Sequence, residues 1–191
     1  MRHSFLFIVI LLAGCSGTRW TDENGLVAYV QDEDNGLRKS EETDGFRITA
    51  TYRPSDFIAR QQMLGTTMEE YDSLLKLYSK YSYFIVDISK QGKDLETAFV
   101  MERSDFASQI SYLASRFSEK ISVRIDDEVK PVSDFIYERS YGMTKSEFLV
   151  AFDGINESDF HLVIDGSELG FGEVSFPFEK NQIKSIPKLR I

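Results

Sequence analysis

Residues that support disulfide, metal or thiol chemistry are scarce in this chain. Its 191 residues include one cysteine and two histidines. A disulfide needs two cysteines, and a zinc site built from cysteine and histidine needs about four ligands. Basic residues are in the minority, with 22 Lys and Arg against 31 Asp and Glu. This acidic balance argues against a nucleic-acid partner. Aromatic residues make up 13% of the chain, enough for a folded core.

The chain also lacks an apolar run long enough to cross a bilayer. Residues Phe5–Leu12 contain no polar side chain, and Arg2 precedes them. A spanning helix needs about 20 apolar residues, so this shorter segment predicts a cleaved secretory signal peptide. The sequence Leu12-Ala13-Gly14-Cys15 follows directly.

This tetrapeptide resembles the lipobox of bacterial lipoproteins. The resemblance implies that the Cys15 thiol carries a diacylglyceryl group, that residues 1–14 are removed, and that the new amino terminus is acylated. Two or three acyl chains together hold a protein stably on a membrane. Ser16 stands where many inner-membrane lipoproteins have Asp, so the resemblance implies the outer membrane. The alternative is a free or buried cysteine beside an ordinary cleavage site.

The predicted mature chain has 21 basic and 31 acidic side chains, a net charge of −10. Anionic headgroups repel such a body, so we expect lipid, and not surface charge, to hold it at the membrane. Residues 15–25 predict the lipidated cysteine and a short tether, whose Trp20 could already dock on the domain. Residues 26–191 show no linker or repeat and predict a single globular domain.

Alternation of apolar and polar residues predicts β-strands along most of this domain. The clearest strand covers residues 46–52, preceded by a hairpin through Thr43-Asp44-Gly45. Residues 82–89 are apolar on both faces and predict a central strand. The further strands we expect are 26–31, 37–42, 121–125, 135–140, 147–152, 160–164 and 174–178.

Helical spacing appears in three places. Ser55 is a candidate cap for a helix at 56–63. Thr67 and Glu70 match a capping box, which predicts a second helix after them. The apolar spacing of residues 105–119 predicts a third helix. The fold class is therefore mainly β (α+β). The later strands resemble an immunoglobulin-like β-sandwich, with two or three helices inserted in the N-terminal half. The mature chain is also similar to uncharacterised envelope lipoproteins, which imply no activity.

No catalytic set is complete. A Ser-His-Asp hydrolase needs a histidine, and the only one after cleavage is His161, in a predicted strand. Gly170-Phe171-Gly172 lacks the third glycine of a dinucleotide-binding loop and predicts a bend between strands. Lipidation would leave the Cys15 thiol unavailable for catalysis. We therefore predict a protein that is not an enzyme and has no cofactor.

Two acidic segments are candidates for calcium sites. Residues 31–42 place Glu33, Asn35 and Glu42 at EF-hand offsets, but Gln31 stands where Asp is expected, which excludes an EF-hand. Asp126-Asp127-Glu128 predicts a solvated turn. We expect no metal site, and a surface calcium ion stays an open alternative.

Aromatic residues offer one further candidate surface. Tyr71, Tyr78, Tyr81 and Tyr83 lie around one predicted helix–strand junction, where they indicate either packing at the core edge or a binding surface. The sequence as a whole favours an outer-membrane-anchored lipoprotein with a non-catalytic binding or assembly role and an envelope protein as a possible partner. The alternatives are a glycan- or ligand-binding module and a carboxylate-dependent hydrolase of envelope polymers.

Overall fold

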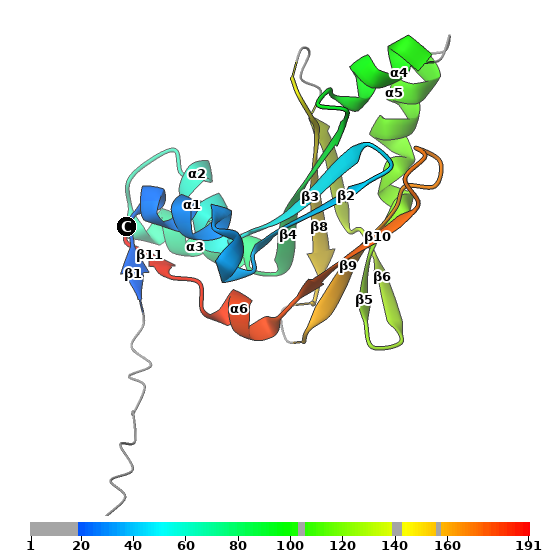
Figure 1. Ribbon diagram of the computed structural model, residues 1–191. Helices are drawn as coiled ribbons and strands as arrows, with labels where there is room; N and C mark the ends of the chain where they lie inside the picture. Colours follow the sequence, from blue (N-terminus) through cyan, green and yellow to red (C-terminus); the bar gives the residue numbers. More distant parts are fainter. Residues whose placement is uncertain (1–18, 103–105, 139–142, 156–157) are drawn as a thin grey trace, which may run out of the picture.

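A five-stranded antiparallel sheet forms the centre of the molecule (Figure 1). The structure is a computed structural model that describes residues 19–102, 106–138, 143–155 and 158–191. The central strand reads Tyr-Ser-Tyr-Phe-Ile-Val-Asp-Ile-Ser-Lys, and its alternate side chains are buried. In sheet order the strands are β2 (Arg38–Thr43), β3 (Phe46–Arg53), β4 (Tyr81–Lys90), β8 (Ser146–Asp153) and β7 (Asp134–Glu138).

A second, four-stranded antiparallel sheet covers one face of the first. Its order is β10 (Glu173–Phe178), β9 (Phe160–Asp165), β5 (Ile121–Ile125) and β6 (Glu128–Pro131). A separate parallel pair joins the two ends of the described chain, β1 (Trp20–Thr21) and β11 (Lys188–Leu189).

Aromatic side chains fill the space between the two sheets. Phe84 on β4 lies 5.9 Å from Phe160 and 5.1 Å from Phe178, measured between ring centroids. All three rings are buried, and edge-to-face contacts of this kind add to the hydrophobic gain. The predicted fold class, mainly β (α+β) with a sandwich-like layout, is confirmed.

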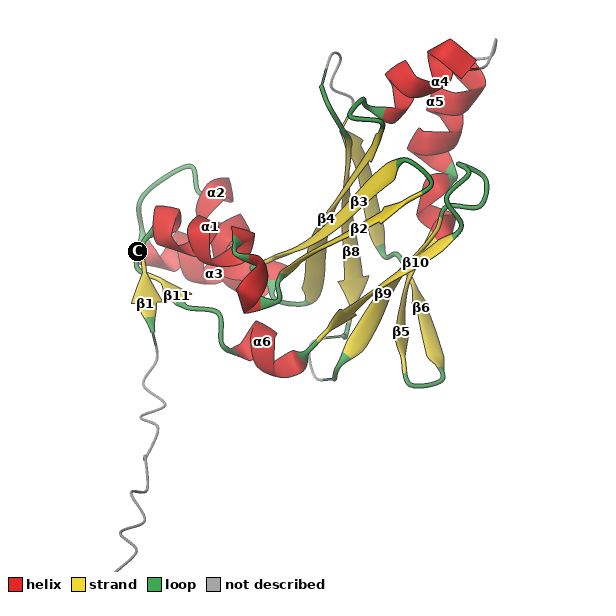
Figure 2. Ribbon diagram, in the orientation of Figure 1, coloured by secondary structure: helices red, strands yellow, loops and turns green. Residues whose placement is uncertain are grey.

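The helices gather in two groups at opposite ends of the five-stranded sheet (Figure 2). The first group contains α1 (Glu23–Gln31), α2 (Ser55–Gln62) and α3 (Met68–Tyr78); the second contains α4 (Leu95–Glu102) and α5 (Phe106–Ser115). Helix α6 (Lys180–Lys184) and the short 3₁₀ helices η1 (Glu33–Asn35) and η2 (Phe117–Lys120) complete the set within the described residues.

The strand predicted at 26–31 is wrong, because these residues belong to α1. The apolar run there suits a strand or a buried helix equally well. The Asp22 side chain decides the outcome by accepting a hydrogen bond from the Gly25 N–H at 2.7 Å, which caps the helix start. Within the described residues, regular secondary structure already precedes Leu26, in β1 and the start of α1.

The structure has more helix than the two or three segments we predict. Helix α4 was missed because it is short and apolar on most sides, so it shows no helical stripe. The hairpin before β3 is confirmed, with Asp44 and Gly45 at positive φ. The Thr67 cap is confirmed too, since its side chain accepts from the Glu70 N–H. Pro54, and not Ser55, precedes α2 as its cap residue.

Candidate functional site

The five-stranded sheet has one face on the core and a second, outer face that the four-stranded sheet does not cover. Along β4, Val86 and Ile88 point into the core, so Ile85 and Asp87 point outward. The register places Asp87 between Thr49 on β3 and Glu147 on β8. Polar side chains therefore form a row across three neighbouring strands.

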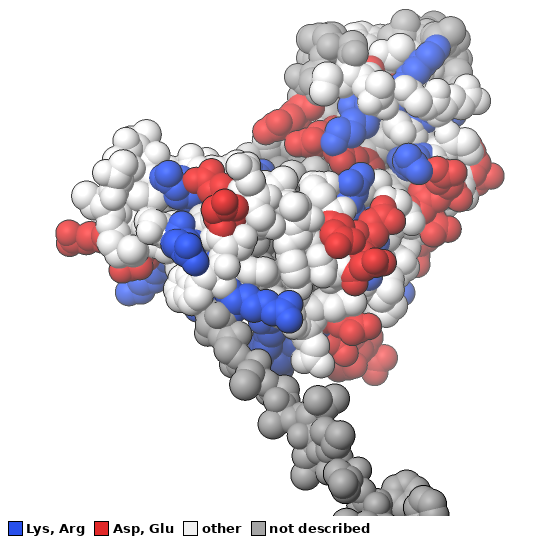
Figure 3. Space-filling model, turned by 60° about the vertical axis from the view of Figure 1, so that its left-hand side comes forward, with Lys and Arg blue, Asp and Glu red and all other residues white. Residues whose placement is uncertain are grey.

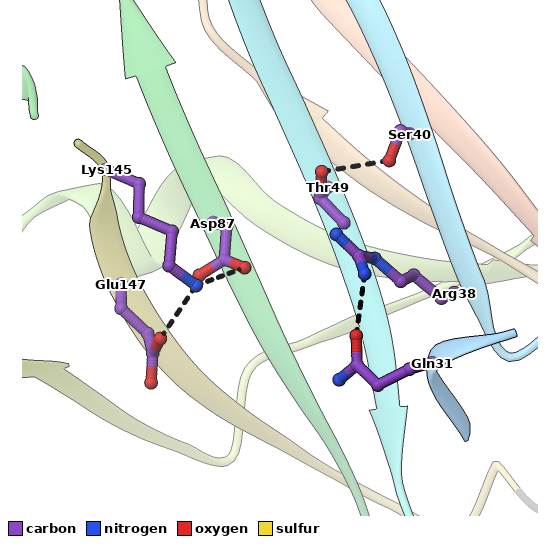
Figure 4. A network of polar contacts seen from close by, with 7 residues as sticks. All are labelled: Gln31, Arg38, Ser40, Thr49, Asp87, Lys145 and Glu147. Atoms are coloured by element: carbon purple, nitrogen blue, oxygen red, sulfur yellow. Dashed lines mark hydrogen bonds and ion pairs between the residues drawn. The ribbon is translucent and has the colours of Figure 1, made fainter. Parts of the chain in front are cut away.

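The centre of this row is a three-residue charge cluster (Figure 4). Lys145 Nζ lies 2.7 Å from Asp87 Oδ2 and 3.2 Å from Glu147 Oε2. Like charges directly opposite one another on paired strands repel, and Glu147 faces both Asp87 and Glu138. The Lys145 ammonium offsets that repulsion and holds the carboxylates in place.

Burial governs the electrostatics of the cluster. The Asp87 side chain is only 15% exposed. Burial raises the pKa of its carboxyl, and the hydrogen bond from Lys145 opposes that rise. Burial also works against the charge on Lys145, yet its bonds to Asp87 and Glu147 outweigh burial and raise its pKa. Lys145 is therefore a cation at neutral pH.

A second polar group lies beside the cluster on β2 and β3. Arg38 Nη1 donates to Gln31 Oε1 at 2.6 Å, which links β2 to the end of α1. The hydroxyls of Ser40 and Thr49 are hydrogen-bonded at 3.0 Å. Arg38 Nε and Asp87 Oδ1 are buried and have no hydrogen-bond partner within the described part of the chain. These atoms are one donor and one acceptor that a ligand could satisfy.

The outer face is hollowed into two adjoining pockets, which we call the sheet trough. The polar pocket has a volume of about 670 Å³ and includes Arg38, Asp87 and Lys145 in its lining. The apolar pocket, about 430 Å³, lies over Thr51 and Ile85, the outward neighbours of Thr49 and Asp87 along their strands. Figure 3 shows a hollow between the two helical ends of the molecule. The other residues that line the apolar pocket include Leu26, Val27, Val30, Phe57, Arg53, Glu138 and Glu147.

The trough offers three kinds of contact. Arg38, Arg53 and Lys145 supply donors, and Asp87 and Glu147 supply acceptors. Side chains of α1 and Ile85 supply apolar surface. Charges of both signs alternate over a short distance, which suits a ligand that itself carries donors, acceptors and apolar groups. An extended polypeptide has that chemistry.

Comparisons with protein-family models, curated proteins and solved structures find no match. The assignment of a function therefore depends on the residues of this chain alone.

Several residues singled out from the sequence lie elsewhere. Cys15 and the predicted signal peptide fall outside the described residues. His161 is exposed on β9, as expected, and its Nδ1 lies 3.1 Å from Ser175 Oγ. Gly170 and Gly172 have positive φ in the bend before β10, which confirms that prediction.

The tyrosines do not form one surface. Tyr71 is buried in α3, whereas Tyr78, Tyr81 and Tyr83 are half-buried, and the ring of Tyr83 packs edge to face with the other two. The ring centroids of Tyr83 lie 6.0 Å from Tyr78 and 6.2 Å from Tyr81. Such mutual packing leaves little ring face free, so it favours the core-edge interpretation.

Metal-ligating clusters and membrane-spanning helices are both absent from the described residues. Within the described residues, no group of three or more His, Cys, Asp or Glu side chains could hold a metal ion. Asp126 begins the β5–β6 turn at positive φ, consistent with a solvated turn. No helix in the described part of the chain is long and apolar enough to cross a membrane.

None of the charge-cluster residues was identified from the sequence. One signal was available, because Asp87 interrupts the apolar strand 84–88. An acid in a central strand has to be paired or has to line a site. Its partners Lys145 and Glu147 lie about sixty positions further on, and only the β4–β8 register brings them together.

Proposed function

We propose that this chain is a lipid-anchored binding protein of the cell envelope whose sheet trough holds an extended segment of an envelope protein. The observation that carries the binding role is the uncovered sheet face, with Arg38, Lys145 and Asp87 around one pocket and apolar side chains around the next. The anchor is supported by the lipobox-like sequence Leu12-Ala13-Gly14-Cys15. Outer-membrane placement is supported by Ser16.

Site-specific photo-crosslinking in cells tests the binding role. A photoreactive phenylalanine replaces Arg47 or Glu138, which are exposed residues that line the trough. The matched control carries it at Asp127, in the exposed β5–β6 turn. We expect a discrete protein adduct from the trough positions and none from Asp127. Equal adduct yields from the trough positions and from Asp127, or an adduct with carbohydrate in place of protein, would contradict the proposal.

A second variant links the adduct to the trough's charges. Arg38→Met keeps the apolar stem and removes the guanidinium. Loss of one charge-assisted hydrogen bond should weaken binding about tenfold, and the adduct yield should fall with it. The thermal unfolding midpoint of the variant provides the check that it folds.

The anchor has its own test. Globomycin treatment should leave an uncleaved precursor, and Cys15→Ser should release the protein from membranes. Unchanged size and unchanged membrane fractionation in both cases would contradict lipidation.

A carboxylate-dependent hydrolase is the second candidate, because Asp87 and Glu147 face each other in the trough and burial raises the pKa of Asp87. Glycoside hydrolysis needs free space between its two carboxyls for sugar or water. Here Lys145 Nζ is within 3.2 Å of both carboxylates and occupies that space. The binding role is therefore favoured. If the protein hydrolysed an envelope polymer and Glu147→Gln abolished that hydrolysis, the hydrolase would become the favoured candidate instead.

A further inference from the structure

The first and last strands of the described residues form a small two-stranded sheet with a distinct outward face. Strands β1 and β11 are parallel, with Trp20 opposite Lys188 and Thr21 opposite Leu189. Side chains alternate along a strand, and Leu189 is buried at 2% exposure. Trp20, Lys188 and Arg190 therefore share the opposite, outward face. Figure 1 places this pair at the edge of the molecule, away from β5 and β6.

The outward face combines an exposed indole with two cations. Trp20 is the only tryptophan of the chain, and 57% of its surface is exposed. Lys188 and Arg190 are exposed, and within the described residues neither has an ion-pair partner within 4.0 Å. This combination is typical of protein segments at a membrane interface.

The two acids closest in sequence to Trp20, Asp22 and Glu23, line a pocket together with Arg190. Asp22 accepts the capping hydrogen bond of α1, and Glu23 Oε1 lies 2.8 Å from Arg60 Nε. The remaining acidic charge of the domain acts weakly at this face, because salt screens exposed charges beyond about 8 Å. The local charge of the face, and not the net charge of the chain, therefore decides how it meets a charged surface.

Chain length places the same face next to the lipid. Trp20 is five residues after Cys15, a span of at most about 18 Å. We propose that Trp20, Lys188 and Arg190 form a docking surface for anionic phospholipid headgroups, which fixes how the domain sits on the membrane. The proposal rests on the lipid anchor proposed above, and it reverses our expectation that surface charge plays no part in holding the domain.

Trp20 itself is the reporter for the test. The full lipidated protein is reconstituted with vesicles of phosphatidylcholine alone or of phosphatidylcholine with phosphatidylglycerol. We expect flotation with both, but a blue-shifted Trp20 emission protected from acrylamide only on the anionic vesicles, and we expect added salt to reverse it. Lys188→Gln/Arg190→Gln should lower the docked-to-undocked ratio about 30-fold. The matched control, Arg116→Gln/Arg124→Gln, removes two exposed cations, one just before η2 and one on β5, and should behave as wild type.

The outcomes separate the docking surface from the anchor. Flotation with an identical Trp20 spectrum on both vesicle types overturns the docking surface and leaves the anchor intact. Salt-sensitive flotation on anionic vesicles only supports the docking surface and overturns the anchor. Flotation with neither overturns both. A blue shift that depends on protein concentration without vesicles assigns the face to a second protein copy and overturns the lipid proposal.

Discussion

Tyr52 is the residue at which burial has the clearest consequence for stability. It lies on β3 at 5% exposure, with its ring 5.4 Å from that of Phe84. Burial raises the pKa of its hydroxyl to about 12, although a hydrogen bond with Ser82 opposes the rise. The folded state thus keeps the proton that the unfolded chain loses near pH 10. The stability from this proton is present below pH 10 and is lost as the pH rises to about 12.

Tyr52→Phe should therefore flatten the alkaline loss of stability. We expect wild type to lose about 2–3 kcal/mol between pH 10 and 12 through Tyr52, because each pKa unit corresponds to about 1.4 kcal/mol. The variant should be about 1 kcal/mol less stable at pH 8, since the bond with Ser82 is gone. Urea unfolding at a series of pH values measures both effects. Tyr29→Phe, whose hydroxyl lies at the surface, is the control, and a wild-type slope in Tyr52→Phe would contradict the assignment.

At the scale of elements, α4 is attached to the five-stranded sheet by a buried carboxylate. Glu96 is 7% exposed and accepts hydrogen bonds from Tyr137 on β7 and from Ser146 on β8, the latter at 2.6 Å. Ser146 Oγ in turn accepts from the Leu95 N–H at 2.9 Å. Three groups far apart in the sequence thus fix the first turn of α4.

Glu96→Ala should detach α4 before it disturbs the strands. The buried Ser146 hydroxyl and the half-buried Tyr137 hydroxyl would lose Glu96 as their acceptor, which costs about 2 kcal/mol of unfolding free energy. Amide hydrogen exchange should speed up across α4, while β4 keeps its protection. Glu119→Ala removes an exposed acid and should leave exchange unchanged. Equal acceleration in α4 and β4 would show instead that the helix and sheet unfold as one unit.

Elements with a strong local signal could be predicted from the sequence. The segment 46–52 alternates apolar and polar residues cleanly, and the segment 121–125 is predicted with its observed ends. The helix α1 could not be separated from a strand, since its apolar residues are contiguous and the deciding Asp22 cap lies before them. Strand β6 is not among the predicted strands, and its first residue, Glu128, belongs to the predicted acidic turn; pairing with β5 forms the strand.

At the scale of the whole molecule, the candidate site arises from long-range pairing. Asp87 and Arg38 come from β4 and β2, Lys145 comes from the bend before β8, and no local spacing in the sequence relates the three residues. The two-stranded sheet is likewise formed by the first and last described strands, so neither strand's own sequence predicts the pairing. Sequence patterns reveal which face of a strand is buried, whereas the trough depends on which strands become neighbours.

The same long-range order predicts that the two sheets unfold together. Phe84 is fully buried and contacts rings of Phe152 in its own sheet and of Phe160 and Phe178 in the other. Phe84→Ala should remove those contacts and cost about 3–5 kcal/mol of unfolding free energy. Because the lost contacts belong to both sheets, the amides of the five-stranded and the four-stranded sheet should lose their exchange protection at one common, lower urea midpoint. Ile136→Ala, at a 47% exposed position of β7, should change stability by less than about 0.5 kcal/mol. Two separated transitions in Phe84→Ala would mean that each sheet is stable without the other.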